Sequence, residues 1–112
     1  MTAGDIEQIA GCKLISDAGS DREITDGYTS DLLSDVMANA PDGSALITIQ
    51  GHKNTIAVAG LAGIPAIILC GGRKAPEDML QAAGKEEISI YSTDDNQFTA
   101  SVKLARLLGL LP

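Results

Sequence analysis

Three short, mostly apolar runs lie in the central and C-terminal parts of the chain. They occupy residues 45–50, 65–70 and 88–91. Runs of this length predict strands that are covered on both faces of a sheet. Each run is followed by a helical pattern, at residues 55–61, at residues 76–84 and in a long last helix capped by Asp94. This alternation predicts parallel strands joined by right-handed crossovers.

The N-terminal third predicts two further helices and one strand. Thr2 and Asp5 have the spacing of a capping box and predict a short helix that ends at Gly11. Residues 13–16 predict a short strand. A second helix, with Thr29 or Ser30 as its N-cap and residues 41–43 as its end, follows from apolar residues at helical spacing. These residues are Leu33, Val36, Met37 and Ala40.

These elements predict one domain that spans residues 1–112. Its fold class is α/β, a three-layer sandwich with a mainly parallel sheet and helices on both faces. The chain has no Trp and a single Phe, Phe98. The core is therefore expected to consist of aliphatic side chains.

The net charge of the chain argues against two classes of binding partner. A formal net charge of -7 repels phosphate backbones and anionic lipid headgroups, so neither nucleic acid nor a membrane surface is expected as a partner. The first residues lack the pattern of a signal peptide, which predicts a cytoplasmic protein. Cys12 and Cys70 have no metal-site spacing and are expected to be buried thiols, so we predict no metal and no cofactor.

Three loops are expected to share a crevice, because the carboxyl ends of parallel strands meet at one edge of a sheet. They span residues 50–54, 70–74 and 91–94 and hold the only His and three of the eight cations. Glycine-rich turns beside helix N-termini suit a small anion, although Gly and Ser are also common in such turns for structural reasons. His52 is either a proton-exchanging group or a structural hydrogen-bonding residue.

The second helix offers another candidate. Asp31, Ser34 and Asp35 are spaced to share one face, which is either a site for a cation or a partner, or a solvated polar surface. No phosphate-binding loop, nucleophile elbow or Cys/His pair is present, so the sequence predicts that the protein is not an enzyme. A small hydrolase that uses Asp31 and His52 as an acid/base pair is the remaining catalytic alternative.

Residues 21–37 and 49–59 resemble a DRTGG domain. The most specific pieces are residues 27–34 and the turn at residues 50–54, and Asp26 replaces the first Gly of the motif's glycine pair. The resemblance implies a regulatory and oligomerising unit of the kind found at the N-terminus of HPr kinase/phosphorylase, in phosphotransacetylases and between the CBS domains of regulated pyrophosphatases. Standalone domains of this type also occur near hydrogenase and redox genes.

The sequence therefore predicts a non-catalytic regulatory domain that senses a small anionic metabolite or nucleotide and forms a homodimer. A leucine-rich last helix suggests the dimer contact, through Leu107, Leu108, Leu110 and Leu111, with the second helix as the alternative surface. The alternative is a protein-interaction adaptor for a metabolic or hydrogenase-type redox enzyme system. The predicted ligand-binding residues are Gly27, Tyr28, Ser30, Asp31, Ser34, Gln50, His52, Asn54, Gly71, Gly72 and Thr93.

Overall fold

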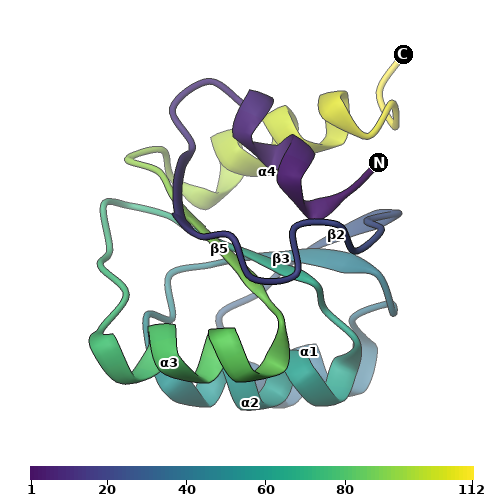
Figure 1. Cartoon of the computed structure of the whole chain (residues 1–112). Helices are drawn as coiled ribbons and strands as arrows, with labels where there is room; N and C mark the ends of the chain where they lie inside the picture. Colours follow the sequence, from purple (N-terminus) through teal and green to yellow (C-terminus); the bar gives the residue numbers. More distant parts are fainter.

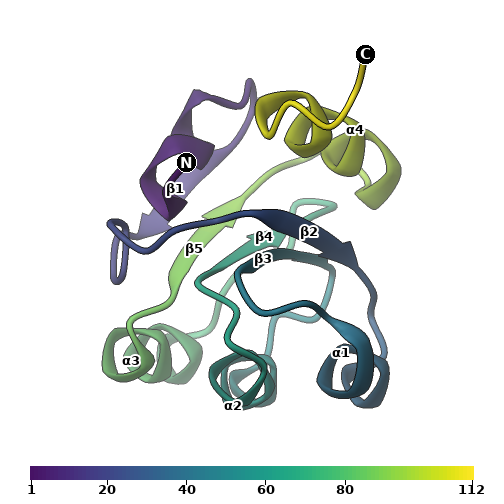
Figure 2. The ribbon, with the colours of Figure 1, turned by 90° about the vertical axis from the view of Figure 1, so that its right-hand side faces the viewer.

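A computed structural model describes residues 1–112 as one five-stranded sheet with helices on both faces (Figures 1 and 2). The strands are β1 (Lys13–Ser16), β2 (Asp26–Thr29), β3 (Ser44–Thr48), β4 (Ala66–Leu69) and β5 (Ser89–Ser92). The helices are the 3-10 helix η1 (Ala3–Gln8), α1 (Leu33–Asn39), α2 (Lys53–Ala62), α3 (Glu77–Glu86) and α4 (Gln97–Leu107). The three-layer α/β sandwich predicted from the sequence is confirmed.

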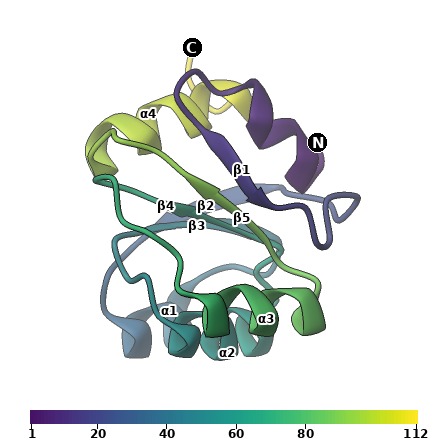
Figure 3. The ribbon, with the colours of Figure 1, turned by 60° about the vertical axis from the view of Figure 1, so that its left-hand side comes forward.

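The strands lie in the order β1-β5-β4-β3-β2. The four strands β2 to β5 are parallel, whereas β1 pairs antiparallel with β5. The N-terminal segment thus closes one edge of the sheet, with Lys13 opposite Ser92 and an irregularity between Leu14 and Ser16 (Figure 3). Because β1 runs against its neighbour, its amino end lies at the carboxyl end of β5.

Two aliphatic cores lie on the two faces of the sheet. Every residue of β3 and β4 is buried, because successive side chains point to opposite faces and both faces are covered. Ala45 and Ile47 of β3 pack toward η1 and α4, while Leu46 packs toward α1, α2 and α3. Figure 2 shows these two helical layers above and below the sheet.

The predicted strands and helices are found, with small differences at their ends. Strand β2 was not predicted, because Asp26 and Gly27 are poor strand formers and the strand lies at a sheet edge with only one neighbour. The predicted N-caps were wrong at two helices. Leu32 is the N-cap of α1, and Asn96 rather than Asp94 is the N-cap of α4, where its side-chain oxygen accepts a hydrogen bond from the Thr99 amide.

The last helix differs from the predicted leucine-rich dimer surface. Leu107 and Leu108 are partly buried against the core between the sheet and α4. Only Leu110 and Leu111, beyond the end of α4, are exposed, at 58% and 43%. No helix combines the length and the apolar character needed to cross a membrane.

The central strand β4 provides a test of the packing. Ile67 is fully buried in the core that faces α1, α2 and α3, so Ile67→Ala is expected to lower the free energy of unfolding by about 2–5 kcal/mol. Urea denaturation followed by circular dichroism measures the loss. Leu61→Ala is the matched control, because Leu61 is 78% exposed and its truncation is expected to cost about 0.5 kcal/mol or less. Equal losses in the two variants would contradict the assignment of the core.

Candidate functional site

Asp31 is the centre of a hydrogen-bond network that joins three segments. Its Oδ1 accepts hydrogen bonds from the Thr48 hydroxyl at 3.0 Å and from the Ile49 amide at 2.9 Å. Its Oδ2 accepts from Gln97 Nε2 at 2.9 Å, and its carbonyl oxygen accepts from Gln50 Nε2 at 3.0 Å. One half-buried carboxylate thus fixes the β2–α1 loop to the end of β3 and to the first turn of α4.

Gln97 was not among the predicted site residues. Its Nε2 donates to Asp31, which leaves its Oε1 buried without a hydrogen-bond partner. The amide cannot turn over, because its oxygen would then face the Asp31 carboxylate. No local sequence signal marks Gln97, since its role depends on a contact with a residue 66 positions away.

Asp35 belongs to a different network from Asp31, which corrects the prediction that the two carboxylates share a helix face. Asp31 precedes α1 and points back to β3, whereas Asp35 accepts hydrogen bonds from the Tyr28 hydroxyl and from Asn39 Nδ2. Hydrogen bonds from Asn39, Ser30 and Tyr28 lower the pKa of Asp35, and the bond to Asp35 raises the pKa of Tyr28. Ser34 is exposed at the start of α1.

The remaining residues of the predicted motif cap a helix, pack against a helix or shape a loop. His52 is the N-cap of α2, and its Nδ1 accepts a hydrogen bond from the Asn54 amide at 3.0 Å. Both side chains are exposed. Gly27 packs beneath α4, where a Cβ atom would come within 2.8 Å of Leu104 Cδ2. Ser30 Oγ accepts from the Leu32 amide at 3.2 Å and shapes the β2–α1 loop.

The three predicted loops do meet at one edge of the sheet. A Cβ atom on Gly51 would lie 2.8 Å from the Lys74 carbonyl oxygen, so the turn before α2 packs closely on the β4–α3 loop. The Gly71 and Gly72 amides donate to the carbonyl oxygens of Asp95 and Thr93, at 2.8 and 3.0 Å. Backbone contacts thus place the β4–α3 loop between the other two loops.

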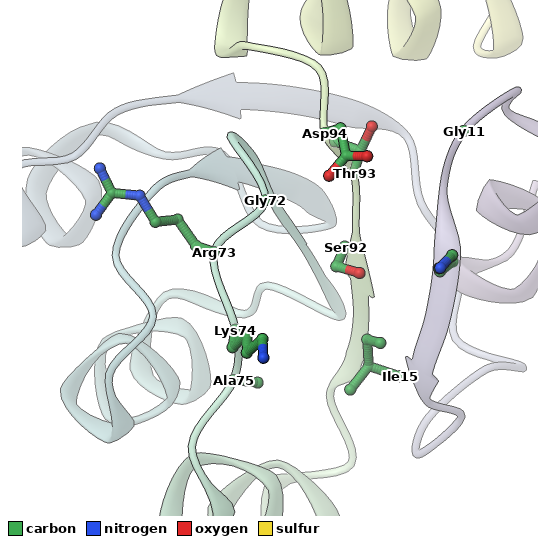
Figure 4. A pocket seen from close by; sticks show the side chains of 10 residues that line it. Gly11, Ile15, Gly72, Arg73, Lys74, Ala75, Ser92, Thr93 and Asp94 are labelled. Atoms are coloured by element: carbon green, nitrogen blue, oxygen red, sulfur yellow. The ribbon is translucent and has the colours of Figure 1, made fainter.

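A pocket of about 370 Å³ opens between this central loop, the end of β5 and the edge strand β1 (Figure 4). Its lining residues are Gly11, Lys13, Ile15, Gly72, Arg73, Lys74, Ala75, Ser92, Thr93 and Asp94. Of the predicted ligand-binding residues, Gly72 and Thr93 line this pocket, and Gly71 is the neighbour of Gly72. The residues from Gly27 to Asn54 support the adjacent loops and do not line the pocket.

Three cations surround this pocket in a chain whose net charge is -7. Lys13, Arg73 and Lys74 are exposed and form no ion pair, since the only ion pair in the protein joins Lys103 to Asp95. The Arg73 guanidinium extends away from Ser92 and Thr93, whereas Ser92 and Thr93 lie along the β5 wall (Figure 4). The two lysines and the Ser92 hydroxyl of β5 therefore provide donors to an oxygen-bearing anion. Lys13 was missed because only the sheet pairing brings β1 beside β5.

Helix α4 is tied to the rim of the pocket by Lys103. The Lys103 ammonium lies 2.7 Å from Asp95 Oδ2 and 3.1 Å from the Ala10 carbonyl oxygen. Ala10 precedes the pocket residue Gly11, and Asp95 follows the pocket residue Asp94. Lys103 therefore links α4 to two segments that flank the pocket.

The two thiols lie on the side of the sheet that faces α4. Cys70 is buried, as predicted, and burial raises the pKa of its thiol to about 11. Cys12 is only partly buried, which corrects the prediction of two buried thiols, and desolvation also raises its pKa. Both thiols are therefore protonated near neutral pH and are poor nucleophiles. No group of three or more His, Cys, Asp or Glu side chains is placed to hold a metal ion.

The contacts of Asp31 predict that removing its carboxylate lowers the stability of the protein considerably. Asp31→Ala is expected to lower the free energy of unfolding by about 2–4 kcal/mol, because it removes three acceptor contacts and leaves half-buried donors unpaired. Asp31→Asn is expected to cost less, because the Gln97 amide can turn over and accept from the new side-chain amide. Asp17→Ala, at an exposed residue, is the control for loss of one charge. Similar midpoints for Asp31→Ala and Asp17→Ala in urea denaturation would refute this role.

The comparisons with known proteins identify a shared fold. No family model and no curated protein matches the chain. A solved structure does match, that of the CBS and DRTGG domains of the regulatory region of Clostridium perfringens pyrophosphatase, complexed with the activator diadenosine tetraphosphate. The TM-score is 0.72 at 17% sequence identity, over 96% of this chain and 46% of that chain. This chain therefore has a fold present in a CBS and DRTGG regulatory region, in agreement with the resemblance predicted from its sequence.

Proposed function

We propose that this protein is a non-catalytic regulatory domain that binds a small anionic metabolite or nucleotide in the pocket beside β1 and β5. The observation that carries the proposal is a pocket of about 370 Å³ that is lined by three of the eight cations of a strongly acidic chain, with Lys13 and Lys74 as the donors. These cations form no ion pair, like every other Lys and Arg except Lys103, so their charges are available to an anion. An anion in the pocket would be attracted by these charges.

The similar structure supports a regulatory role. The Clostridium perfringens regulatory region is complexed with a nucleotide activator, and this chain shares the fold of part of it. That region is about twice as long as the matched segment, so the position of its activator is not transferred to this chain. The cationic pocket is an independent reason to propose an anionic ligand here.

A regulatory domain also needs a surface that is linked to the ligand pocket and contacts another protein chain. Helix α4 has this position, because Lys103 connects it to both sides of the pocket rim. Phe98, in the first turn of α4, is 78% exposed, and Leu110 and Leu111 follow the end of the helix. We propose that a second copy of the chain packs on this surface.

A protein-interaction adaptor is the second candidate. Leu32 is 64% exposed beside Asp31, whose carboxylate contacts Gln97, the neighbour of Phe98. Exposed apolar side chains near one another favour a protein contact. An adaptor would use this surface without needing the cationic pocket.

Anion binding is tested by thermal shift and calorimetry with pyrophosphate and ADP. A ligand at about 100 times its dissociation constant adds about 2.7 kcal/mol, which raises the melting temperature of a domain of this size by roughly ten degrees. Lys13→Gln/Lys74→Gln is expected to abolish this rise. The matched control is Lys85→Gln/Arg106→Gln, which makes the same change in net charge outside the pocket. Absence of binding to the native protein, or equal loss in both double variants, would favour the adaptor.

Dimerisation is tested separately by light scattering at micromolar concentration. The native protein is expected to have twice the mass of one chain, and Phe98→Ser/Leu110→Ser is expected to be monomeric, because it removes exposed apolar contacts without touching the core. Leu61→Ser, at an equally exposed residue of α2, is the control and is expected to remain dimeric. A monomeric native protein would refute the dimer.

A further inference from the structure

The cationic pocket contains one carboxylate, from Asp94. A Cβ atom on Gly72 would lie 3.2 Å from Asp94 Oδ1, so this oxygen is held over the glycine at the pocket wall. The neighbouring Asp95 is paired with Lys103, whereas Asp94 has no hydrogen-bond or ion-pair partner through its side chain. Asp94 lies at one end of the pocket, beside Thr93, and Lys74 lies at the other end (Figure 4).

This arrangement is unfavourable for a ligand that consists only of an anion. A carboxylate repels a phosphate group, and Asp94 forms no ion pair. A ligand that fits both ends has an anionic group for the lysines and hydrogen-bond donors for the carboxylate. Neutral donors suit Asp94 better than an ammonium group, because an ammonium would approach Lys13 and Lys74 in the same pocket.

We propose that the ligand is a phosphate ester that carries a vicinal diol, the chemistry shared by ribonucleotides and pentose phosphates. The two oxygens of a carboxylate can accept hydrogen bonds from two adjacent hydroxyl groups, and an acidic residue binds ribose in this way in dinucleotide-binding folds. The phosphate lies toward Lys74 and toward Lys13, whose register partner Ser92 provides a further hydroxyl donor. This inference rests on the proposed function, because it names the ligand class of the same pocket.

The test compares ligands that differ only in the diol. Calorimetry with native protein is expected to show ADP binding about 10–100 times more tightly than 2′,3′-dideoxy-ADP, because two hydrogen bonds to a charged acceptor are lost. Asp94→Ala is expected to bring this ratio close to one. The same variant is expected to bind pyrophosphate at least as tightly as native protein, because it removes a repulsive charge.

The control for the carboxylate is Asp78→Ala, an exposed residue of α3 outside the pocket, which is expected to keep the native ratio. Asp94 is itself exposed and its side chain has no partner, so its variant is expected to fold, and circular dichroism checks this. The affinity for ribose 5-phosphate tells whether the diol belongs to a pentose phosphate or to a ribonucleotide. Affinity equal to that of ADP supports a pentose phosphate, and weaker binding supports a ribonucleotide.

A ligand without a diol and a pocket that binds no anion give different results in these measurements. Equal affinity of native protein for ADP and its dideoxy analogue overturns the diol, while pyrophosphate binding that is lost in Lys13→Gln/Lys74→Gln still supports an anion sensor. A ratio that persists in Asp94→Ala also overturns the assignment to this carboxylate. Absence of binding by all four compounds overturns both.

Discussion

The burial of β3 and β4 on both faces is the constraint on which the rest of the structure depends. Every side chain of these strands is removed from water, so helices must cover both sides of the sheet. Parallel strands covered in this way need helical crossovers, and the crossovers bring the carboxyl ends of the strands to one edge. The candidate site lies at that edge because the apolar core places the loops there.

The loops at this edge of the sheet are held together mainly by polar contacts. Asp31 joins the β2–α1 loop to β3 and α4, and Gly51 packs on the Lys74 carbonyl. These contacts explain why several residues of the DRTGG-like motif lie near the pocket without lining it. Their chemistry maintains the shape of the loops, and the charges that face the pocket come from neighbouring positions.

Electrostatics gives this small domain its most distinctive feature. The protein is acidic overall, yet Lys13, Arg73 and Lys74 gather at one pocket without ion-pair partners. Lys103 takes the one ion pair of the molecule and uses it to join α4 to the pocket rim. Lys103 thus links α4 to Ala10 and Asp95, which flank the pocket residues Gly11 and Asp94.

The sequence alone determined the α/β class, the buried strands, the helices between them and the meeting of three loops, because aliphatic runs and helical periodicity are local signals. It did not reveal β2, whose polar residues form a strand only through pairing with β3. Tertiary structure alone decided that Asp31 and Asp35 belong to separate networks and that Gln97 completes the first of them. It also placed Lys13 in the pocket, because the antiparallel pairing of β1 with β5 joins residues from opposite ends of the chain and no local pattern encodes such a contact.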